Sequence, residues 1–233
     1  MLTPPTSQPW LKVCGLRSPQ QAAAVAALGA DAIGVIAVPQ SPRWLAPELR
    51  QALFAAVGAA RADCLGVLVV ADPSDVDLPL LGPGAGHQVL QLHGGESPQR
   101  CGQIRQRLGP ELILWKALRI RSEQDLEQAQ AYAAVVDALL LDAWVPDQLG
   151  GTGHRIPIEW LEGFRPSLPW WLAGGITPES LPQALPLLSS MGCNPPVGVD
   201  ASSGVERAPG DKNLDRVAQL VAAVAAFRQD RPI

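Results

Sequence analysis

Short apolar runs alternate with amphipathic segments along the whole chain. The apolar runs have the length of buried strands and are apolar on both faces, as the strands of a parallel sheet are. They predict eight strands, at residues 10–14, 32–38, 64–70, 89–93, 112–118, 138–142, 170–174 and 197–200. The stretches between them, several with capping residues, predict helices at about 18–28, 47–57, 97–108, 122–136 and 158–164, from 177 onward, and at about 213–228.

The connection after the third strand differs from the others. Residues 71–87 contain Pro79, Pro83 and several glycines, which leave room for little more than a turn or two of helix. Strands that each lead into a helix allow either a doubly wound sheet or a closed barrel, and eight such units without a long linker favour the barrel. We therefore expect an α/β fold, a single (β/α)8 TIM barrel over residues 10–230, whose third unit has a shortened or absent helix. A disordered or extended segment, residues 1–9, precedes it.

Composition narrows the class of function. The 233 residues suit a barrel, and a net charge of -4 argues against a nucleic-acid partner. No apolar stretch is long enough to span a membrane, and no signal-peptide pattern opens the chain. The four cysteines follow no Cys-x-x-Cys spacing, so neither a zinc site nor a disulfide framework is indicated, and the cytoplasm is the expected compartment. A monomer is favoured over a homodimer, because no long exposed apolar strand or coiled coil is evident.

The first strand carries two residues that are unusual in a core. Successive side chains of a strand point to opposite faces, so Lys12 and Cys14 share one face while Leu11 and Val13 share the other. A cysteine near a positive charge ionises readily, and a thiolate acts as a base or a nucleophile. The structural alternative, with Cys14 as a small core residue and Lys12 at a strand edge, is the better one for this stretch alone.

Polar residues also follow the ends of other predicted strands. In a barrel the active site lies at the carboxyl ends of the strands, and this chain places Arg43, His93, Asp142 and Asp200 there. Each one alone has an ordinary explanation as a strand cap, a loop anchor or a surface cation. Their shared location at one end of the predicted barrel indicates an active site.

Two glycine-bearing turns follow the last two strands, at Gly174-Gly175 and Ser203-Gly204. Backbone amides in such turns can converge on an anion, and glycine permits a close approach. The loops after strands seven and eight are a recurring phosphate site in barrels. Ordinary tight turns are the alternative, but two of them in these two loops favour phosphate binding.

A series of short motifs runs in one order from residue 12 to about 213. The motifs are KVCGL (12–16), SPR (41–43), QLHG (91–94), LLD (140–142), GGTG (150–153), AGGITPE (173–179) and GVDASSGVE (198–206). Each motif is weak, but the ordered set is specific, and it resembles that of the phosphoribosylanthranilate isomerase family. The resemblance implies a (β/α)8 barrel. It also implies the Amadori rearrangement of N-(5-phosphoribosyl)anthranilate to 1-(o-carboxyphenylamino)-1-deoxyribulose 5-phosphate, a step of tryptophan biosynthesis.

The resemblance also implies a role for each matching residue. Cys14 is the general base and Asp142 the general acid. Arg43 clamps the anthranilate carboxylate, a task that suits its planar fork, and His93 and Lys12 belong to the substrate-binding residues. The implied phosphate-binding residues are Gly151, Gly174, Gly175, Asp200, Ser202, Ser203 and Gly204. The implied partner is a small phosphosugar substrate, and no metal or organic cofactor is implied.

The implied base, Cys14, and the implied acid, Asp142, need opposite protonation states. Cys14 must be substantially thiolate near neutral pH, which a nearby cation such as Lys12 would favour. Asp142 must hold a proton, which needs an apolar setting or a neighbouring negative charge.

Two other functions suit the same fold. Indole-glycerol-phosphate synthase is also a phosphate-binding barrel, but it relies on lysine and glutamate at the strand ends, and its motif series does not match. A barrel that has lost catalysis would only bind a phosphosugar or a partner protein, and the intact Cys14 and Asp142 count against it. Trp44, Trp115 and Trp144 lie near strand ends or loops and could flank an aromatic substrate, although packing in the core or on the surface is the ordinary role of each.

Overall fold

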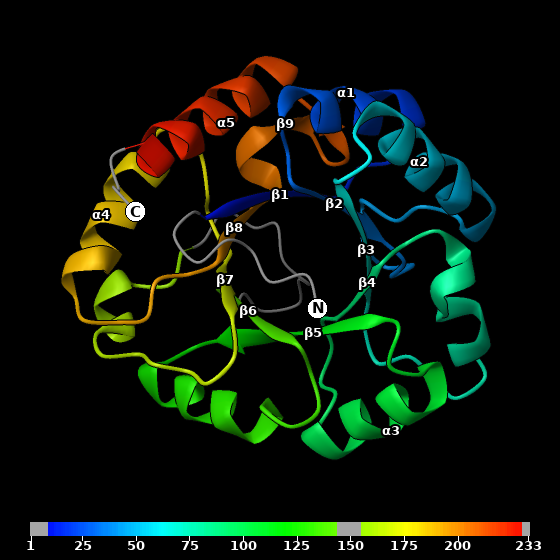
Figure 1. Ribbon diagram of the computed structural model, residues 1–233, viewed down its shortest axis with the longest axis horizontal. Coiled ribbons are helices and arrows are strands. Elements are labelled where there is room, and N and C mark those ends of the chain that lie inside the picture. Colours follow the sequence, from blue (N-terminus) through cyan, green and yellow to red (C-terminus); the bar gives the residue numbers. More distant parts are fainter. Residues whose placement is uncertain (1–8, 144–154, 230–233) are drawn as a thin grey trace.

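Eight parallel strands form a closed barrel in the computed structural model, which describes residues 9–143 and 155–229 (Figure 1). Each strand pairs with the next in chain order, and β8 pairs back with β1. The strands are β1 (Trp10–Cys14), β2 (Ala32–Ile36), β3 (Leu65–Val70), β4 (Val89–Leu92), β5 (Ile113–Ile120), β6 (Ala138–Ala143), β7 (Trp170–Leu172) and β8 (Gly198–Ala201). The predicted TIM barrel is confirmed, although β2 and β7 end two residues earlier than expected.

Helices surround the barrel on its outer side (Figure 1). The α-helices are α1 (Pro19–Leu28), α2 (Pro47–Ala60), α3 (Pro98–Leu108), α4 (Leu181–Ser190) and α5 (Leu214–Gln229). The 3-10 helices are η1 (Leu78–Leu81), η2 (Pro83–Ala85), η3 (Glu123–Tyr132), η4 (Ile158–Leu161) and η5 (Ser203–Val205). A small antiparallel ribbon, β9 (Glu206–Ala208) and β10 (Asp211–Lys212), follows β8.

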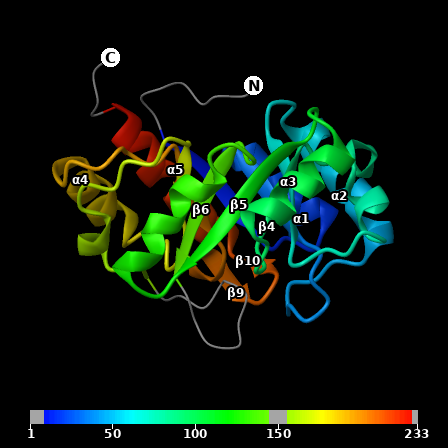
Figure 2. The ribbon, with the colours of Figure 1, turned by 90° about the horizontal axis from the view of Figure 1, so that it is seen from below.

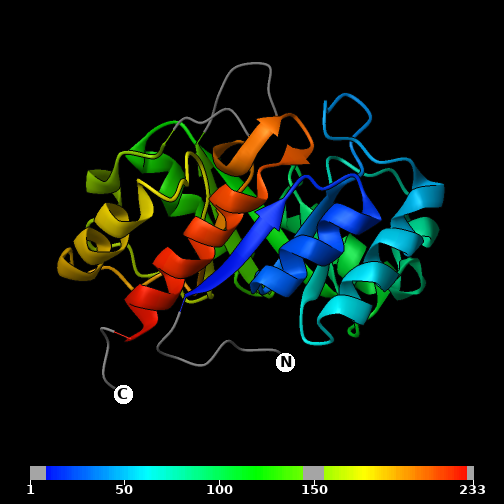
Figure 3. The same ribbon diagram turned by 90° about the horizontal axis from the view of Figure 1, so that it is seen from above.

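The ribbon and the loop between β2 and α2 lie at the same end of the barrel, the end at which the strands finish (Figures 2 and 3). This shared position matters because the loop carries Arg43 and the ribbon carries Glu206 and Lys212.

Capping side chains define several helix starts. The hydroxyl of Ser18 accepts a hydrogen bond from the amide of Gln21, as the predicted start signature of α1 requires, and Ser97 caps α3 in the same way. The side-chain oxygen of Asn213 accepts from the amides of Asp215 and Arg216 at the start of α5. Local sequence therefore determines where these three helices begin.

A helix lies within the predicted segment 122–136, but it is the 3-10 helix η3, which ends at Tyr132. Its buried residues are Leu126, Ala129 and Tyr132, which follow one another at every third position. A spacing of three matches the 3.0 residues per turn of a 3-10 helix rather than the 3.6 of an α-helix. Between β3 and β4 the described chain forms only the two 3-10 turns η1 and η2.

Two other helices are shorter than expected. The helix predicted over 158–164 is the single turn η4, and Gly163 follows it in the left-handed region, with φ of 68°. The helix predicted to begin at Thr177 is assigned only from Leu181, because Thr177 and Ser180 instead exchange side-chain-to-amide hydrogen bonds.

Side chains of the strands alternate between the two faces of the barrel wall. Leu11 and Val13 point outward into the layer beneath the helices, while Cys14 packs inside the barrel, as the sequence predicts. Inside the barrel, Trp115 lies against Trp171 with ring centroids 4.7 Å apart. Trp115 therefore fills the core.

No helix among the described residues is long and apolar enough to cross a membrane.

Candidate active site

A pocket opens at the carboxyl ends of the strands and brings most of the predicted site residues together. The predicted residues that line it are Cys14, Arg43, His93, Asp142, Gly174, Gly175, Asp200, Ser202, Ser203 and Gly204. The structure adds an apolar wall made of Ile36, Val38, Val69, Ala173 and Ile176. Lys12 does not line the pocket, Gly151 and Trp144 lie outside the described residues, and neither Trp44 nor Trp115 is among the lining residues.

Lys12 lies in the barrel interior and forms an ion pair with a pocket residue. Its Nζ atom is 2.8 Å from Oδ2 of Asp200, and the Lys12 side chain is fully buried. Burial alone would lower the pKa of Lys12, but Asp200 and Cys14 together raise the pKa above its ordinary value. Asp200 and Cys14 therefore favour the charged form of Lys12 against the effect of burial.

The environment of Cys14 disfavours the thiolate when no substrate is bound. Burial raises the pKa of the Cys14 thiol, and this effect outweighs the opposite effects of Lys12 and Lys212. Burial therefore opposes the expected ionisation of Cys14 at neutral pH, although Lys12 acts in the predicted direction. Gly34 makes room for the sulfur, since a methyl group there would lie 2.5 Å from Cys14 Sγ.

His93 connects Asp142 to a buried amide. Nε2 of His93 is 3.2 Å from Oδ2 of Asp142, but the two atoms do not meet in hydrogen-bond geometry. On the other side of the ring, the side-chain amide of Gln91 lies 3.0 Å from His93 Nδ1. An amide N–H that donates to Nδ1 leaves the proton of the neutral imidazole on Nε2, which faces Asp142.

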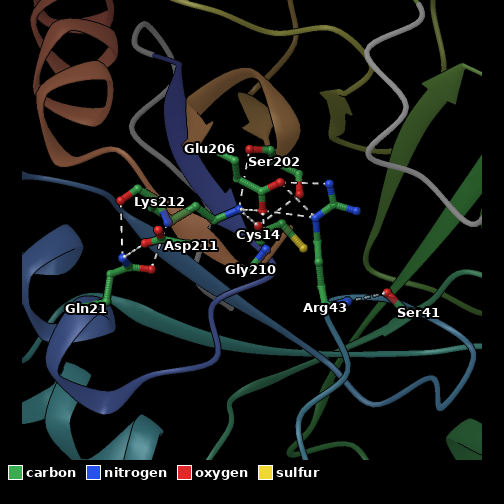
Figure 4. Close-up of polar contacts among 9 residues, drawn as sticks. All are labelled: Cys14, Gln21, Ser41, Arg43, Ser202, Glu206, Gly210, Asp211 and Lys212. Atoms are coloured by element: carbon green, nitrogen blue, oxygen red, sulfur yellow. Dashed lines mark hydrogen bonds and ion pairs between the residues drawn. The ribbon is translucent and has the colours of Figure 1, made fainter. Parts of the chain in front are cut away.

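Arg43 is held by a carboxylate from the ribbon (Figure 4). Its Nη2 atom is 2.8 Å from Oε2 of Glu206, and its Nε atom is 3.0 Å from Oε1. Lys212 binds the same carboxylate, with Nζ 2.6 Å from Oε1. Burial alone would raise the pKa of Glu206, but Arg43 and Lys212 together hold the pKa below its ordinary value.

The glycine turns after β7 and β8 place glycine where a side chain would be strained or would clash. Gly174 and Gly175 have φ of 86° and 61°, a left-handed backbone conformation that residues other than glycine rarely adopt. Gly204 touches the neighbouring loop so closely that a methyl group there would lie 2.0 Å from the carbonyl oxygen of Ile176. The two loops therefore pack together, and residues of both line the pocket.

Among the described residues, no group of three or more histidine, cysteine, aspartate and glutamate side chains is arranged to hold a metal ion.

The arrangement combines four chemical capabilities in one pocket. A thiol and a carboxyl group enter from β1 and β6, which lie across the barrel from each other. A guanidinium group stands beside an apolar wall, and glycine turns offer amides to an anion. Such a pocket can bind a molecule with two anionic ends and an apolar part. Its thiol and carboxyl groups can transfer protons to and from that molecule.

Sequence reasoning missed the residues that support the site. Glu206 belongs to a quoted motif, but nothing in the sequence indicates that it pairs with Arg43. Lys212 has no sequence signal, and Gln91 is visible only as the neighbour of His93 in the QLHG motif. Each of them contacts a residue that lines the pocket: Glu206 contacts Arg43, Gln91 contacts His93, and Lys212 contacts the carbonyl of Cys14.

Comparison with known proteins agrees with this geometry. Residues 11–223 match the family described as N-(5'phosphoribosyl)anthranilate (PRA) isomerase. The chain is 46% identical to N-(5'-phosphoribosyl)anthranilate isomerase of Synechocystis sp., over 93% of this chain and 96% of that protein. It is 47% identical to the enzyme of the same name from Nostoc punctiforme, over 90% and 95%.

Solved structures give the same result. Phosphoribosyl anthranilate isomerase from Thermus thermophilus is 31% identical, with a TM-score of 0.74 over 93% of this chain and 98% of that one. The structure of phosphoribosyl anthranilate isomerase from Thermotoga maritima is 26% identical, with a TM-score of 0.79 over 94% and 100%. The chain therefore belongs to the N-(5'-phosphoribosyl)anthranilate isomerase family.

Proposed function

We propose that Cys14 and Asp142 are the general base and general acid with which this isomerase of tryptophan biosynthesis rearranges N-(5-phosphoribosyl)anthranilate. The observation that carries the proposal is that both side chains line one pocket, together with Arg43 and the glycine turns. The product is 1-(o-carboxyphenylamino)-1-deoxyribulose 5-phosphate. The conversion is an isomerisation in which C2' is oxidised to the ketone while C1' of the same molecule is reduced, so no external oxidant or reductant is needed and an acid and a base suffice.

The acid acts first, at the ribose ring. Asp142 gives a proton to the ring oxygen as the bond between C1' and that oxygen breaks. The lone pair of the anthranilate nitrogen forms the new C=N bond, which yields a protonated Schiff base. The position of His93 supports this role, because its Nε2 atom lies 3.2 Å from Oδ2 of Asp142 and bounds the space that the carboxyl group can occupy.

The base acts second, at C2'. Cys14 takes the C2' proton, the C–H electrons form a C1'=C2' bond, and the C=N electrons return to nitrogen. The resulting enolamine tautomerises to the ketone. A protonated Schiff base beside Cys14 is an opposite charge that lowers the thiol pKa, so the substrate itself offsets the effect of burial.

The remaining residues bind the two ends of the substrate. The glycine turns 174–175 and 202–204 receive the phosphate, since both turns line the pocket and backbone amides in such turns can converge on an anion. Arg43 receives the carboxylate, and Ile36, Val38 and Val69 pack against the aromatic ring. Both ends are then held while the reacting carbons lie between Cys14 and Asp142.

The test is turnover of freshly formed N-(5-phosphoribosyl)anthranilate, followed by the loss of its anthranilate fluorescence. We expect Cys14→Ser and Asp142→Asn each to lower kcat by about 10²- to 10⁴-fold, the usual contribution of acid–base catalysis. Cys193→Ser and Asp63→Asn are matched controls, because both residues lie outside the pocket.

Two results would overturn the assignment. Turnover that survives Cys14→Ser nearly intact would keep the reaction but assign the base elsewhere. If the folded wild-type protein binds the substrate without turning it over, the isomerase assignment is wrong and the protein is a barrel that only binds a phosphosugar.

The monomeric state and the cytoplasmic location expected from the sequence stay predictions. Sedimentation of the purified chain and fractionation of cells that express it would check them.

A further inference from the structure

Two charged residues stand behind Arg43 without lining the pocket. Glu206 and Lys212 come from the β9–β10 ribbon, and their side chains are 5% and 0% exposed. Figure 4 shows Lys212 and Arg43 reaching the carboxylate of Glu206 from opposite sides. A substrate in the pocket cannot touch either residue, so both must act through Arg43 or through Cys14.

Lys212 is held in its charged form by its surroundings. Its Nζ atom donates to three acceptors: Oε1 of Glu206, the carbonyl of Cys14 and the carbonyl of Ser202. Only an ammonium group has three protons to give. Burial lowers the pKa of Lys212, but three acceptors, one of them a carboxylate, oppose the loss of its proton.

The carboxylate of Glu206 is saturated by its own partners. Oε1 accepts from Lys212, from Arg43 Nε and from the amide of Gly210, and Oε2 accepts from Arg43 Nη2. Glu206 therefore has no capacity left for a ligand, and its position determines the position of the Arg43 guanidinium.

Charge then decides what Arg43 can bind. Arg43 and Glu206 alone would form a neutral pair, and a substrate carboxylate beside that pair would leave an uncompensated buried negative charge. With Lys212 included, the three side chains carry a net charge of one positive unit. One added carboxylate makes the whole group neutral.

We propose that Lys212 is a specificity-determining positioning residue, which keeps the Arg43–Glu206 pair net positive so that Arg43 can bind the carboxylate of the substrate. This inference rests on the proposed role of Arg43. Lys212 makes no contact with the substrate, and it selects for a substrate with a carboxylate by supplying the charge that Glu206 cancels.

The test compares two substrates that differ by one carboxylate. They are N-(5-phosphoribosyl)anthranilate and N-(5-phosphoribosyl)aniline, and the measured quantity is the ratio of their kcat/KM values. An effect of a variant on folding or on Cys14 applies to both substrates and cancels in the ratio. Turnover of the aniline compound also shows that a variant is folded.

We expect Lys212→Met to lower the ratio by about tenfold or more, since a desolvated charge pair at a binding site is worth at least that much. Lys212→Met/Glu206→Gln removes both charges and restores the net charge of Arg43 alone, so it should return the ratio towards the wild-type value. Glu206→Gln alone should not lower the ratio. A purely structural role predicts instead that the double variant is the worst of the three.

Arg43→Met tests the role of Arg43 separately from the role of Lys212. If Arg43→Met lowers the ratio and Lys212→Met leaves it unchanged, the role of Lys212 is wrong and the role of Arg43 stands. If neither variant changes the ratio, carboxylate binding at Arg43 is wrong and the inference fails with it. If Lys212→Met turns over neither substrate, the comparison of Glu206→Gln with the wild type decides, because a lowered ratio there contradicts the charge argument.

Discussion

Nε2 of His93 lies 3.2 Å from Oδ2 of Asp142, at the mouth of the barrel. The two residues come from β4 and β6, which are separated by β5, so the curvature of the closed sheet brings them together. Gln91, two residues before His93 in the chain, is within hydrogen-bond distance of the opposite ring nitrogen. The three side chains therefore form a row that ends on the proposed acid.

This row predicts the tautomer of His93. We expect Nδ1 to be unprotonated and Nε2 to carry the proton in the neutral ring, because the Gln91 amide donates to Nδ1. Nitrogen-15 spectra of the imidazole rings at neutral pH measure this directly. Gln91→Leu should remove the preference and lower kcat by about three- to tenfold, the value of one neutral hydrogen bond. A protonated Nδ1 in the wild type would show that the Gln91 amide is turned the other way.

The pH dependence of Cys14 follows from its burial. Its pKa lies above the ordinary value, so the thiol keeps its proton to a higher pH than an exposed cysteine, for which the pKa is about 8.5. Because the reaction needs the thiolate, kcat/KM should rise with pH through this region. Lys12→Met removes a cation that lowers the pKa, and should move the midpoint further upward.

Alkylation of Cys14 by iodoacetamide, followed by mass spectrometry of the modified peptide, measures the same titration without substrate. A midpoint below that of a free thiol would mean that Lys12 and Lys212 outweigh burial. In that case, Cys14 would be more ionised than a free thiol before the substrate binds.

His87 makes stability depend on pH outside the active site. It is buried in the connection before β4, where its Nε2 atom lies 3.1 Å from the carbonyl of Leu81 and burial lowers its pKa from 6.5 to about 4. Between these two values the unfolded chain binds a proton that the folded chain does not, so stability falls as the pH falls. The loss is about 3 kcal/mol in full and about 2 kcal/mol by pH 5.

Urea unfolding at pH 7 and pH 5 checks this expectation. His87→Gln should be less stable than the wild type at pH 7 but should lose about 2 kcal/mol less between the two values. An unchanged difference between pH 7 and pH 5 would assign the dependence to other groups.

Lys116 holds the loop that follows β4. Its Nζ atom is 2.8 Å from Oε2 of Glu96 and 2.8 Å from the carbonyl of Gly94, and both ion-pair partners are almost fully buried. Lys116→Met leaves Glu96 unpaired and should lower the free energy of unfolding by about 3–5 kcal/mol. Arg107→Met is the control, because the pair of Arg107 with Asp75 is exposed to solvent and should contribute little to stability. Equal losses in the two variants would contradict this account.

Local sequence was sufficient to locate the strands and most helix starts. It did not distinguish a 3-10 helix from an α-helix. The alternation of Lys12 and Cys14 with Leu11 and Val13 identified the two faces of β1 correctly. In η3, the sequence indicated a helix but not its type, and the residues that the structure buries there, Leu126, Ala129 and Tyr132, follow the spacing of three of a 3-10 helix.

The sequence by itself determined the barrel and the members of its pocket. Repeated strand–helix units with parallel strands bring every strand's carboxyl end to one side of the fold, so Cys14, His93, Asp142 and Asp200 share one mouth as soon as they follow strands. The tertiary structure alone decided how these residues are partnered and charged. Arg43 and Glu206 are 163 positions apart, and the balance of burial against Coulomb attraction at Cys14 depends on distances that exist only after the barrel has closed.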